Sequence, residues 1–149
     1  RARELGFQWA ACLDGDGQHF PSDLTALFEV AEREHADLVV GNRMQIPESI
    51  PWLRRQVNRW MSRRLSKLAG RDLPDTQSGL RLMCLDAWHG LPIRAEGFEV
   101  ESDVLLAFIR AGHKVSFAPV GVRYGQEQSK IRPVYDTVRW FRWWMRVRR

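Results

Sequence analysis

The stretch from Leu13 to Leu24, L-D-G-D-G-Q-H-F-P-S-D-L, places two aspartates around one glycine, between an apolar segment and the start of a helix. The residues from Phe7 to Leu13 form a nearly continuous apolar run of strand length, which is typical of a buried parallel strand. Pro21 then opens a helix with apolar residues at helical spacing. A second apolar strand from Asp37 to Gly41 completes a predicted βαβ unit with a right-handed crossover.

Further patterns predict more elements around this unit. We expect a strand at 80–85, a helix from Val100 to Ala111 and a strand at 114–119. We also expect an amphipathic helix from Pro51 to Ala69, capped by Gly70. Its inner stripe consists of apolar residues three or four positions apart: Leu53, Val57, Trp60, Met61, Leu65 and Leu68. These alternating strands and helices predict the α/β class, and 149 residues suffice for one domain with a real core.

The chain is basic, with a net charge of +5, and its cations are clustered. Residues 54–71 hold seven Arg or Lys and residues 139–149 hold five Arg, with no acid in either segment. Such patches favour phosphates, nucleic acid or an anionic membrane as partners. A basic nucleic-acid-binding module therefore stays open, although no known nucleic-acid motif is present. Cys12 and Cys84 lie in apolar stretches, so we expect both to be small buried core residues in a reducing compartment.

The D-G-D segment is either a polar turn or a metal site. It follows a buried strand, and open α/β sheets bind ligands at the carboxyl ends of their strands. Asp14, Asp16 and Gln18 offer hard oxygen ligands of the kind that Mg²⁺ or Mn²⁺ prefers. An EF-hand loop starting at Asp14 is excluded, because His19 stands at its sixth position and Thr25 at its twelfth. His19 is a further candidate ligand, or only a hydrogen-bonding residue beside the turn.

Six segments then follow one another in the order seen in family 2 glycosyltransferases. They are the stretch quoted above, A-D-L-V-V-G-N-R, N-R-W-M-S-R-R-L, D-T-Q-S-G-L-R, G-F-E-V-E-S-D-V-L-L and Y-G-Q-E-Q-S-K-I. Over nearly the whole chain, the sequence most resembles the polyprenyl-phosphate glycosyltransferases, the dolichyl-phosphate mannosyltransferase group. The resemblance implies a GT-A fold, a mixed α/β sheet flanked by helices, that transfers a sugar from a nucleotide-diphosphate sugar, with inversion, to a polyprenyl phosphate.

The resemblance also assigns roles to residues. Asp14, Asp16 and Gln18 would hold the divalent ion, Mg²⁺ or Mn²⁺, on the diphosphate of the nucleotide-sugar. Arg43, and Arg59 with Ser62, match positions that face the acceptor phosphate. Arg123 and Lys130 would supply the remaining positive charge on the loop before the last helix, where relatives often carry an additional Arg.

One departure from the family concerns the start of the chain. Family members begin with a strand carrying an I-P-x-x-N-E signature and a second strand whose Asp grips the base, and neither precedes D-G-D here. We therefore expect residues 1–137 to form the C-terminal two-thirds of a GT-A catalytic domain, without its first nucleotide-binding strands. A degenerate relative without catalysis remains an alternative.

The chemistry of the acceptor decides whether a base is required. A lipid phosphate is largely dianionic at pH 7 and needs cations to position it but no general base. A glycan hydroxyl would need a carboxylate base, and the candidates are Glu99, Glu101 and Asp103, of which Glu101 is the preferred one. These acids otherwise complement a helix N-terminus. The turn residues Asp75, Gln77 and Ser78 are expected to line the same cleft, or to form a structural Asx-type turn.

Residues 138–149 are predicted to form a basic amphipathic tail helix. Arg139, Arg142, Arg146 and Arg149 would lie on one stripe, and tryptophans on the rest. Such a helix suits an anionic membrane surface, with tryptophans at headgroup depth, or it packs on the domain through its aromatic face. The membrane alternative predicts a cytoplasmic protein attached peripherally to the cytoplasmic membrane.

Overall fold

The computed structural model describes residues 1–15, 17–45, 50–121 and 133–148. In chain order, its elements are β1 (Trp9–Cys12), α1 (Asp23–Glu34), β2 (Leu38–Asn42), the 3-10 helix η1 (Arg43–Gln45), α2 (Trp52–Ala69), β3 (Arg81–Cys84), α3 (Leu85–Trp88), α4 (Val100–Arg110), β4 (Val115–Pro119) and α5 (Pro133–Val147). The strands form one sheet in the order β1-β3-β2-β4. Because β3 is antiparallel to both neighbours while β2 and β4 are parallel, the sheet is mixed, as the family resemblance implies.

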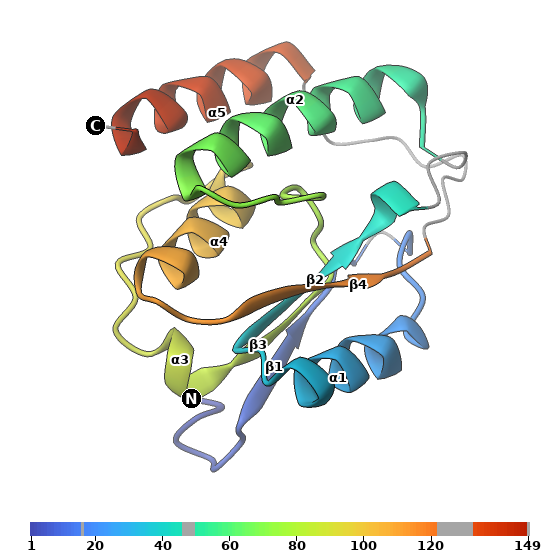
Figure 1. The fold of residues 1–149 in the computed structure, drawn as a ribbon, viewed down its shortest axis with the longest axis vertical. Coiled ribbons are helices and arrows are strands. Elements are labelled where there is room, and N and C mark those ends of the chain that lie inside the picture. Colours follow the sequence, from blue (N-terminus) through green and yellow to red (C-terminus); the bar gives the residue numbers. More distant parts are fainter. Residues whose placement is uncertain (16, 46–49, 122–132, 149) are drawn as a thin grey trace.

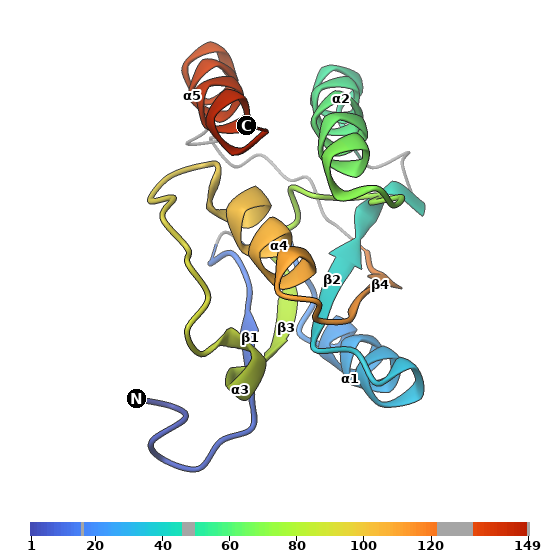
Figure 2. The same ribbon diagram turned by 60° about the vertical axis from the view of Figure 1, so that its left-hand side comes forward.

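The sheet has a helix layer on each side (Figure 1). On one face, α1 packs through Leu27, Val30 and Ala31. On the other, α4 lies against the sheet, and α2 and α5 form an outer layer above it (Figure 2). Successive side chains of β2 point to opposite faces of the sheet, since Leu38 belongs to the core under α4 while Val39 belongs to the core under α1. This alternation is the two-residue period of a strand buried on both faces.

Helix ends follow the glycine signals in the sequence. Gly70 follows α2 with a φ of 67°, and its N–H donates to the carbonyl of Ser66, which confirms it as the predicted cap. Gly112, after α4, has a φ of 81°. Within α2, Met61 and Leu65 are fully buried, as predicted for the inner stripe. The stripe is shorter than predicted, however, because Leu53 is 63% exposed in the first turn of α2.

Strand β1 differs from the expected buried parallel strand. Its described neighbour is β3 alone, to which it is antiparallel, so it runs parallel to β2 without pairing with it. Its second half is exposed, and Phe7 and Leu13 on either side of it are exposed as well. Cys12 is therefore exposed and Cys84, at the other end of the same ladder, is half-buried. The prediction that both cysteines are buried was wrong, because an apolar run does not reveal which strands flank it.

The tail does not form a helix of its own. It belongs to α5, which begins at Pro133, and Trp140, Trp143 and Trp144 are buried in the core that α5 shares with α2 and α4. The ring of Trp60 on α2 lies 5.5 Å from that of Trp140 and 6.2 Å from that of Phe141. The tryptophans thus occupy the domain core and not the lipid-facing position considered for them. No helix in the described part of the chain is long and apolar enough to cross a membrane.

Candidate functional site

The D-T-Q-S-G turn, residues 75–79, is held by side chains from several elements. Its Asp75 accepts two bonds from the Arg43 guanidinium, Nε to Oδ2 at 2.8 Å and Nη2 to Oδ1 at 3.0 Å. The backbone N–H groups of Arg43 and Gln77 also donate to this carboxylate. Burial raises the pKa of Asp75, but the charge and hydrogen bonds of Arg43 outweigh it, so the pKa lies below its usual value. Asp75 and Arg43 therefore form a buried, bidentate ion pair between the end of β2 and the turn.

The middle of the turn is bonded to α2 and α4. The Thr76 N–H donates to Ser62 Oγ on α2 at 3.1 Å. The Gln77 amide donates from Nε2 to Thr76 Oγ1 at 2.9 Å and to Ser102 Oγ on α4 at 2.8 Å. Ser102 Oγ also accepts the indole N–H of Trp140 at 2.8 Å, so α5 is connected to the turn through α4. The predicted residues Ser62 and Gln77 are thus brought together, and both are buried in the domain.

Arg81, on β3, donates hydrogen bonds to main-chain carbonyls of the turn and of α4. Its Nε donates to the carbonyl of Ser78 at 2.9 Å, and Nη2 donates to that of Thr76 at 3.3 Å. Its Nη1 donates to the carbonyl of Glu101, in the first turn of α4, at 2.6 Å. Burial lowers the pKa of Arg81 to about 10, against the opposing effect of the Glu101 and Asp75 carboxylates, so the group remains a cation at neutral pH.

The D-G-D loop meets this turn at Gly79. The Asp14 carboxylate lies where a Cβ on Gly79 would stand, so any larger residue there would overlap it. Asp14 is otherwise open, with 58% of its side chain exposed, whereas the His19 side chain beside it is buried, with Nε2 4.0 Å from Asp14 Oδ2. Gln18 is half-buried, and Asp16 lies outside the described residues. The contact places the first predicted metal ligand at the carboxyl end of β1, directly on the 75–79 turn.

The three acids around α4 have different surroundings. Asp103 accepts the N–H groups of Arg94 and Ala95 at 2.8 and 2.9 Å and the indole N–H of Trp143 at 3.0 Å, which is a structural role. Glu99 accepts two bonds from Arg139.

Glu101 is half-buried beside Arg81, and burial raises its pKa although Arg81 opposes the shift and Asp14 adds to it. The Asp14 carboxylate of the D-G-D loop is thus part of the electrostatic environment of Glu101.

The remaining predicted site residues are either exposed on the helices or outside the described residues. Arg59 is exposed on α2, one turn from the buried Ser62. Arg123 and Lys130 lie outside the described residues, so their predicted roles stay predictions. On α5, Arg142 and Arg146 are exposed while Arg139 is paired with Glu99, and Arg149 is again outside the described residues.

The cluster also contains residues that the sequence did not single out. Arg81 is one, and its signal was a charged residue inside the otherwise apolar strand L-R-L-M-C-L. Gly79 is another, since its role appears only when Asp14 is seen against it. Two polar atoms of the turn, Gln77 Oε1 and Ser78 Oγ, are buried without a hydrogen-bond partner among the described residues. Such atoms in native proteins usually meet ordered water or a ligand.

The donor set at the D-G-D loop fits a hard divalent cation. Asp14 supplies an accessible carboxylate that is positioned by Gly79, and Gln18 supplies an amide oxygen nearby in the chain. Within the described ranges no three His, Cys, Asp or Glu side chains converge as a complete metal site. Asp16, the other carboxylate predicted to bind the ion, is not among these described residues.

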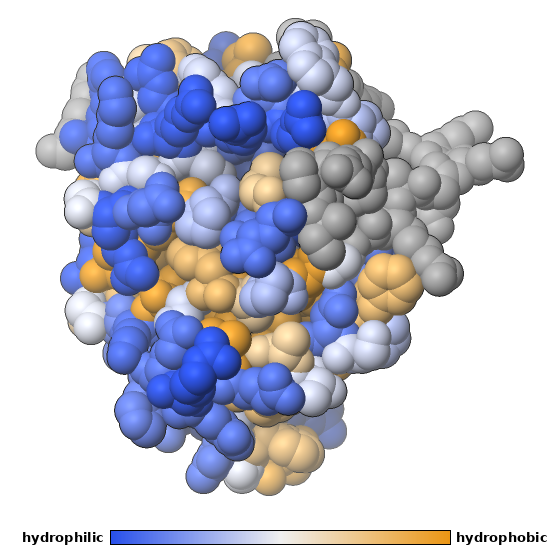
Figure 3. Space-filling view, turned by 45° about the vertical axis from the view of Figure 1, so that its right-hand side comes forward, coloured by the Kyte–Doolittle hydropathy of each residue, from blue (hydrophilic) through white to orange (hydrophobic). Residues whose placement is uncertain are grey.

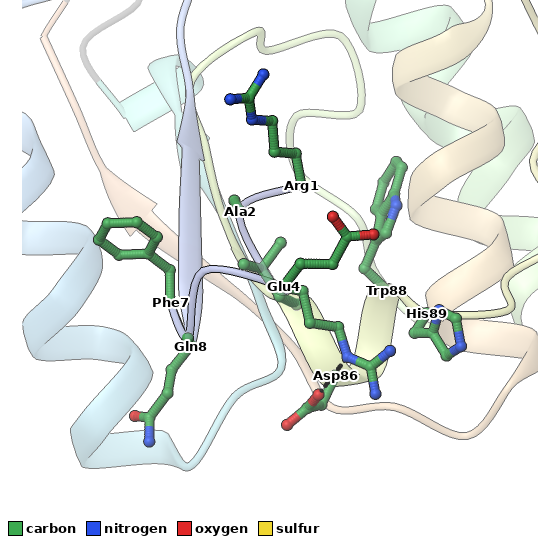
Figure 4. Close-up of a pocket in the computed structure, with 11 residues that line it drawn as sticks. Arg1, Ala2, Glu4, Phe7, Gln8, Asp86, Trp88 and His89 are labelled. Carbon is green, nitrogen blue, oxygen red and sulfur yellow. Dashed lines mark hydrogen bonds and ion pairs between the residues drawn. The ribbon is translucent and has the colours of Figure 1, made fainter.

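A pocket of about 670 Å³ lies elsewhere, between the first eight residues and α3 (Figure 4). It is lined by Glu4, Phe7, Asp86 and Trp88, among others, and an ion pair of 2.8 Å joins Arg3 to Asp86 across it. None of the predicted site residues lines it. It lies at the amino end of β1, whereas Asp14 follows the carboxyl end of that strand.

Comparison with known proteins gives one matching family model and several similar sequences. The family model described as Glycosyl transferase family 2 matches residues 2–88, which include the D-G-D loop, the G-N-R segment and the 75–79 turn. The chain is 30% identical over 128 residues, 83% of its length, to the UDP-N-acetylglucosamine–dolichyl-phosphate N-acetylglucosaminyltransferase of Methanococcus voltae, and covers 50% of that protein.

Two relatives come from Haloferax volcanii. Glycosyltransferase AglJ is 28% identical over 72% of the chain, which covers 36% of that protein. The low-salt glycan biosynthesis hexosyltransferase Agl6 is 27% identical over 66% of the chain, which covers 25% of it. The chain thus spans half or less of the length of these curated relatives. With the mixed sheet, the D-G-D loop and the family model in agreement, the chain belongs to glycosyl transferase family 2.

Proposed function

We propose that the protein transfers a sugar from a nucleotide-diphosphate sugar to a polyprenyl phosphate. The observation that carries the proposal is the meeting of three distant segments at one edge of the sheet: Asp14 lies on Gly79 of the 75–79 turn, which is in turn bonded to Arg43. This arrangement supports the proposal, because it puts a carboxylate that could share a cation with a diphosphate near a positive charge that could attract an acceptor phosphate. The printed name of the Methanococcus voltae relative, a transferase to dolichyl phosphate, supports this acceptor class.

In this proposal an oxygen of the lipid phosphate attacks the anomeric carbon of the sugar. The bond from that carbon to the diphosphate breaks, and its electron pair leaves with the nucleoside diphosphate, which inverts the anomeric configuration. Asp14, Asp16 and Gln18 would hold Mg²⁺ or Mn²⁺. When bound, such an ion neutralises charge on the leaving diphosphate as a Lewis acid. Because the lipid phosphate is largely dianionic at neutral pH, the protein needs no base for this step.

The cationic residues would then position the acceptor. Arg43 is buried and directs Nε and Nη2 to Asp75, so it would contribute positive charge near the acceptor. Arg59 is exposed on α2 and would make the direct contact with the phosphate. The planar guanidinium of arginine binds phosphate through two parallel bonds, which a lysine cannot do. Arg123 and Lys130 would add charge on the preceding loop. Ser62, Asp75, Gln77 and Ser78 would support this side of the cleft as a rigid block, since all four are buried.

A second candidate is transfer to a glycan hydroxyl, with Glu101 as the base. The observation that favours it is the raised pKa of Glu101, caused by burial near Asp14, because a base poised nearer neutral pH is the more effective one. The two candidates differ in the acceptor that they require. A phosphorylated lipid serves the first and an unphosphorylated glycan serves the second.

We also propose that the protein works on the cytoplasmic side, attached peripherally to an anionic membrane that carries its acceptor. Helix α2 has six cationic residues and no acid. Along the top of the molecule, where α2 and α5 lie, Figure 3 shows a row of strongly hydrophilic side chains. Trp52 and Tyr135, in the first turns of these two helices, are 67% and 59% exposed and could enter the headgroup region. Each Arg near such a surface adds roughly 1 kcal/mol of attraction.

The test of the function compares two arginines of one helix in the full-length protein. Arg59→Ala should lower transfer to a polyprenyl phosphate by about tenfold or more, as expected for a charged bond to phosphate. Arg63→Ala, which removes an exposed cation one turn further along α2, is the matched control and should change transfer little. Arg43→Ala is less informative, because it would also leave the buried Asp75 without its partner. Equal losses in both variants, or equal rates on an unphosphorylated glycan, would contradict the lipid-phosphate acceptor.

A further inference from the structure

We propose that Arg81 is a positioning residue of the transfer site, which fixes the 75–79 turn relative to the first turn of α4. The inference rests on the proposed function, because only in a transfer site would the turn that contacts Asp14 and the helix that carries Glu101 have to be held at a fixed distance. The hydrogen bonds of the Arg81 guanidinium go to the turn and to α4, and not to a substrate group. Arg81 acts through main-chain carbonyls.

The bonding pattern of Arg81 is the first argument. Its three donor nitrogens go to three carbonyl oxygens, those of Thr76, Ser78 and Glu101, at 2.6 to 3.3 Å. Two of these oxygens belong to the turn and the third belongs to α4, so one guanidinium joins segments that are more than 20 residues apart. The fork of arginine holds its donors in one plane, which a lysine ammonium does not. The link is therefore geometric as well as electrostatic.

The place of Arg81 in the sheet is the second argument. Arg81 pairs with Cys12 on β1 and with Val40 on β2, so its backbone lies between the two strands that lead into the D-G-D loop and into Arg43. The turn that it holds carries Gly79, on which Asp14 rests. The helix turn that it holds carries Glu101. By fixing the 75–79 turn against the first turn of α4, Arg81 sets the distance between Asp14 and Glu101.

The burial of a charge is the third argument. Arg81 is 4% exposed, and a buried cation is unfavourable unless its donors are satisfied. Met83, the next residue of β3 on the same face of the sheet, is apolar and buried, so the core on this side does not itself require a charge. The Arg81 side chain is therefore explained by what it holds in place and not by packing alone.

The experiment compares three variants of the full-length protein. Arg81→Lys keeps the charge without the three-way fork, and Arg81→Met removes both. Arg71→Met is the matched control, since the Arg71 guanidinium also donates to a main-chain carbonyl, that of Val115 at 2.9 Å, but at a place remote from the turn. Transfer is measured at a temperature at which all variants are folded. Hydrogen exchange is followed in residues 75–79, in the first turn of α4 and in α1.

If Arg81 positions the site, both Arg81 variants should lose about tenfold to a hundredfold in kcat, with a smaller change in KM for the nucleotide-sugar. Exchange should become faster in the turn and in α4 together, and stay unchanged in α1. Full rescue by lysine, or activity like that of the Arg71 control, would overturn the inference. If the wild type shows no transfer, the proposed function is wrong, and hydrogen exchange alone tests the role of Arg81. Unchanged protection of residues 75–79 or of the first turn of α4 in the Arg81 variants would then show that Arg81 does not hold the two segments together.

Discussion

The turn at residues 75–79 and the loop that carries D-G-D meet at Gly79, yet they are anchored in different ways. Asp75 is completely buried and bonded to a charged partner, whereas more than half of the Asp14 side chain is exposed. The turn is bonded to η1, β3, α2 and α4. The described part of the loop contacts the turn where Asp14 lies against Gly79.

This difference indicates a division of work within the proposed site. A rigid half can hold groups in the geometry that transfer requires, and it needs no reorganisation when the substrate binds. An exposed half can complete its coordination sphere with ligands from the substrate. Substitutions of the buried polar side chains of the turn should therefore act mainly on stability, and substitutions that remove or displace Asp14 should act mainly on ligand binding.

The largest expected effect comes from Asp75→Asn. It leaves the buried Arg43 cation without its carboxylate, and breaking a buried pair from one side costs about 3–5 kcal/mol. Asp14→Asn, in the exposed half, should change the free energy of unfolding by less than about 0.5 kcal/mol. Denaturant unfolding of the two variants measures both values. Equal effects would contradict the division between a rigid and an open half.

The same pair predicts a response to acid. Because the pKa of Asp75 is lowered in the folded chain, its contribution to stability is present above the unfolded value of 3.8 and is lost as the pH falls through the lower, folded value. The difference in stability between wild type and Asp75→Asn should therefore shrink only below about pH 4. A difference that already disappears near pH 6 would show that another group is responsible.

The next largest effect should come from Trp140→Phe. The substitution removes the indole N–H that donates to Ser102 and leaves space in a fully buried position, which together should cost about 1–3 kcal/mol. Met145→Ala, on the exposed side of the same helix, is the control and should stay within about 0.5 kcal/mol. Thermal unfolding distinguishes them. If both variants are neutral, α5 is not part of the rigid half.

The sequence predicted most of the fold because burial on both faces leaves a direct signal. The apolar runs that became β2 and β4 and the helical spacing in α2 were sufficient to place these elements. The sequence did not show which strands are neighbours in the sheet. An apolar run alone did not show that β1 has an exposed half, nor that β3 would separate it from β2.

The site was predictable only as a set of motifs. Arg43, Ser62, Asp75 and Gln77 were expected near the same cleft, and the structure brings them together, but bonded to one another and to the protein. Sequence spacing cannot distinguish a polar residue that faces substrate from one that satisfies a neighbour in the core. The tryptophans of α5 show the same limit, since an amphipathic pattern fits a lipid surface and a domain core equally well.

A smaller effect on stability, but a larger one on ligand binding, is expected from Gly79→Ala. The added methyl would overlap the Asp14 carboxylate and displace it from the turn. We expect Mn²⁺ with a nucleoside diphosphate to bind about tenfold more weakly, as after loss of one positioning contact. Calorimetric titration of Gly79→Ala and the wild type measures the change, and identical affinities would remove Gly79 from the site.

The smallest expected effect concerns Glu101 and the pH dependence of stability. Burial raises the pKa of Glu101 above 4.5 in the folded chain, so the unfolded chain releases this proton first as the pH rises. Wild-type stability should therefore decline relative to Glu101→Gln from about pH 4.5 up to the folded pKa, and the difference should then stay constant. Glutamine keeps the shape of the side chain without the charge that burial disfavours.

Glu96→Gln, on the exposed loop before α4, is the matched control for this comparison. Unfolding in denaturant at a series of pH values between 4 and 8 yields the three stability curves. If wild type and Glu101→Gln run parallel, Glu101 is no more perturbed than a surface carboxylate, and the glycan-hydroxyl alternative loses its support. If wild-type stability instead declines relative to Glu101→Gln as the pH rises, the pKa of Glu101 is raised in the folded protein, as burial and the nearby Asp14 carboxylate require.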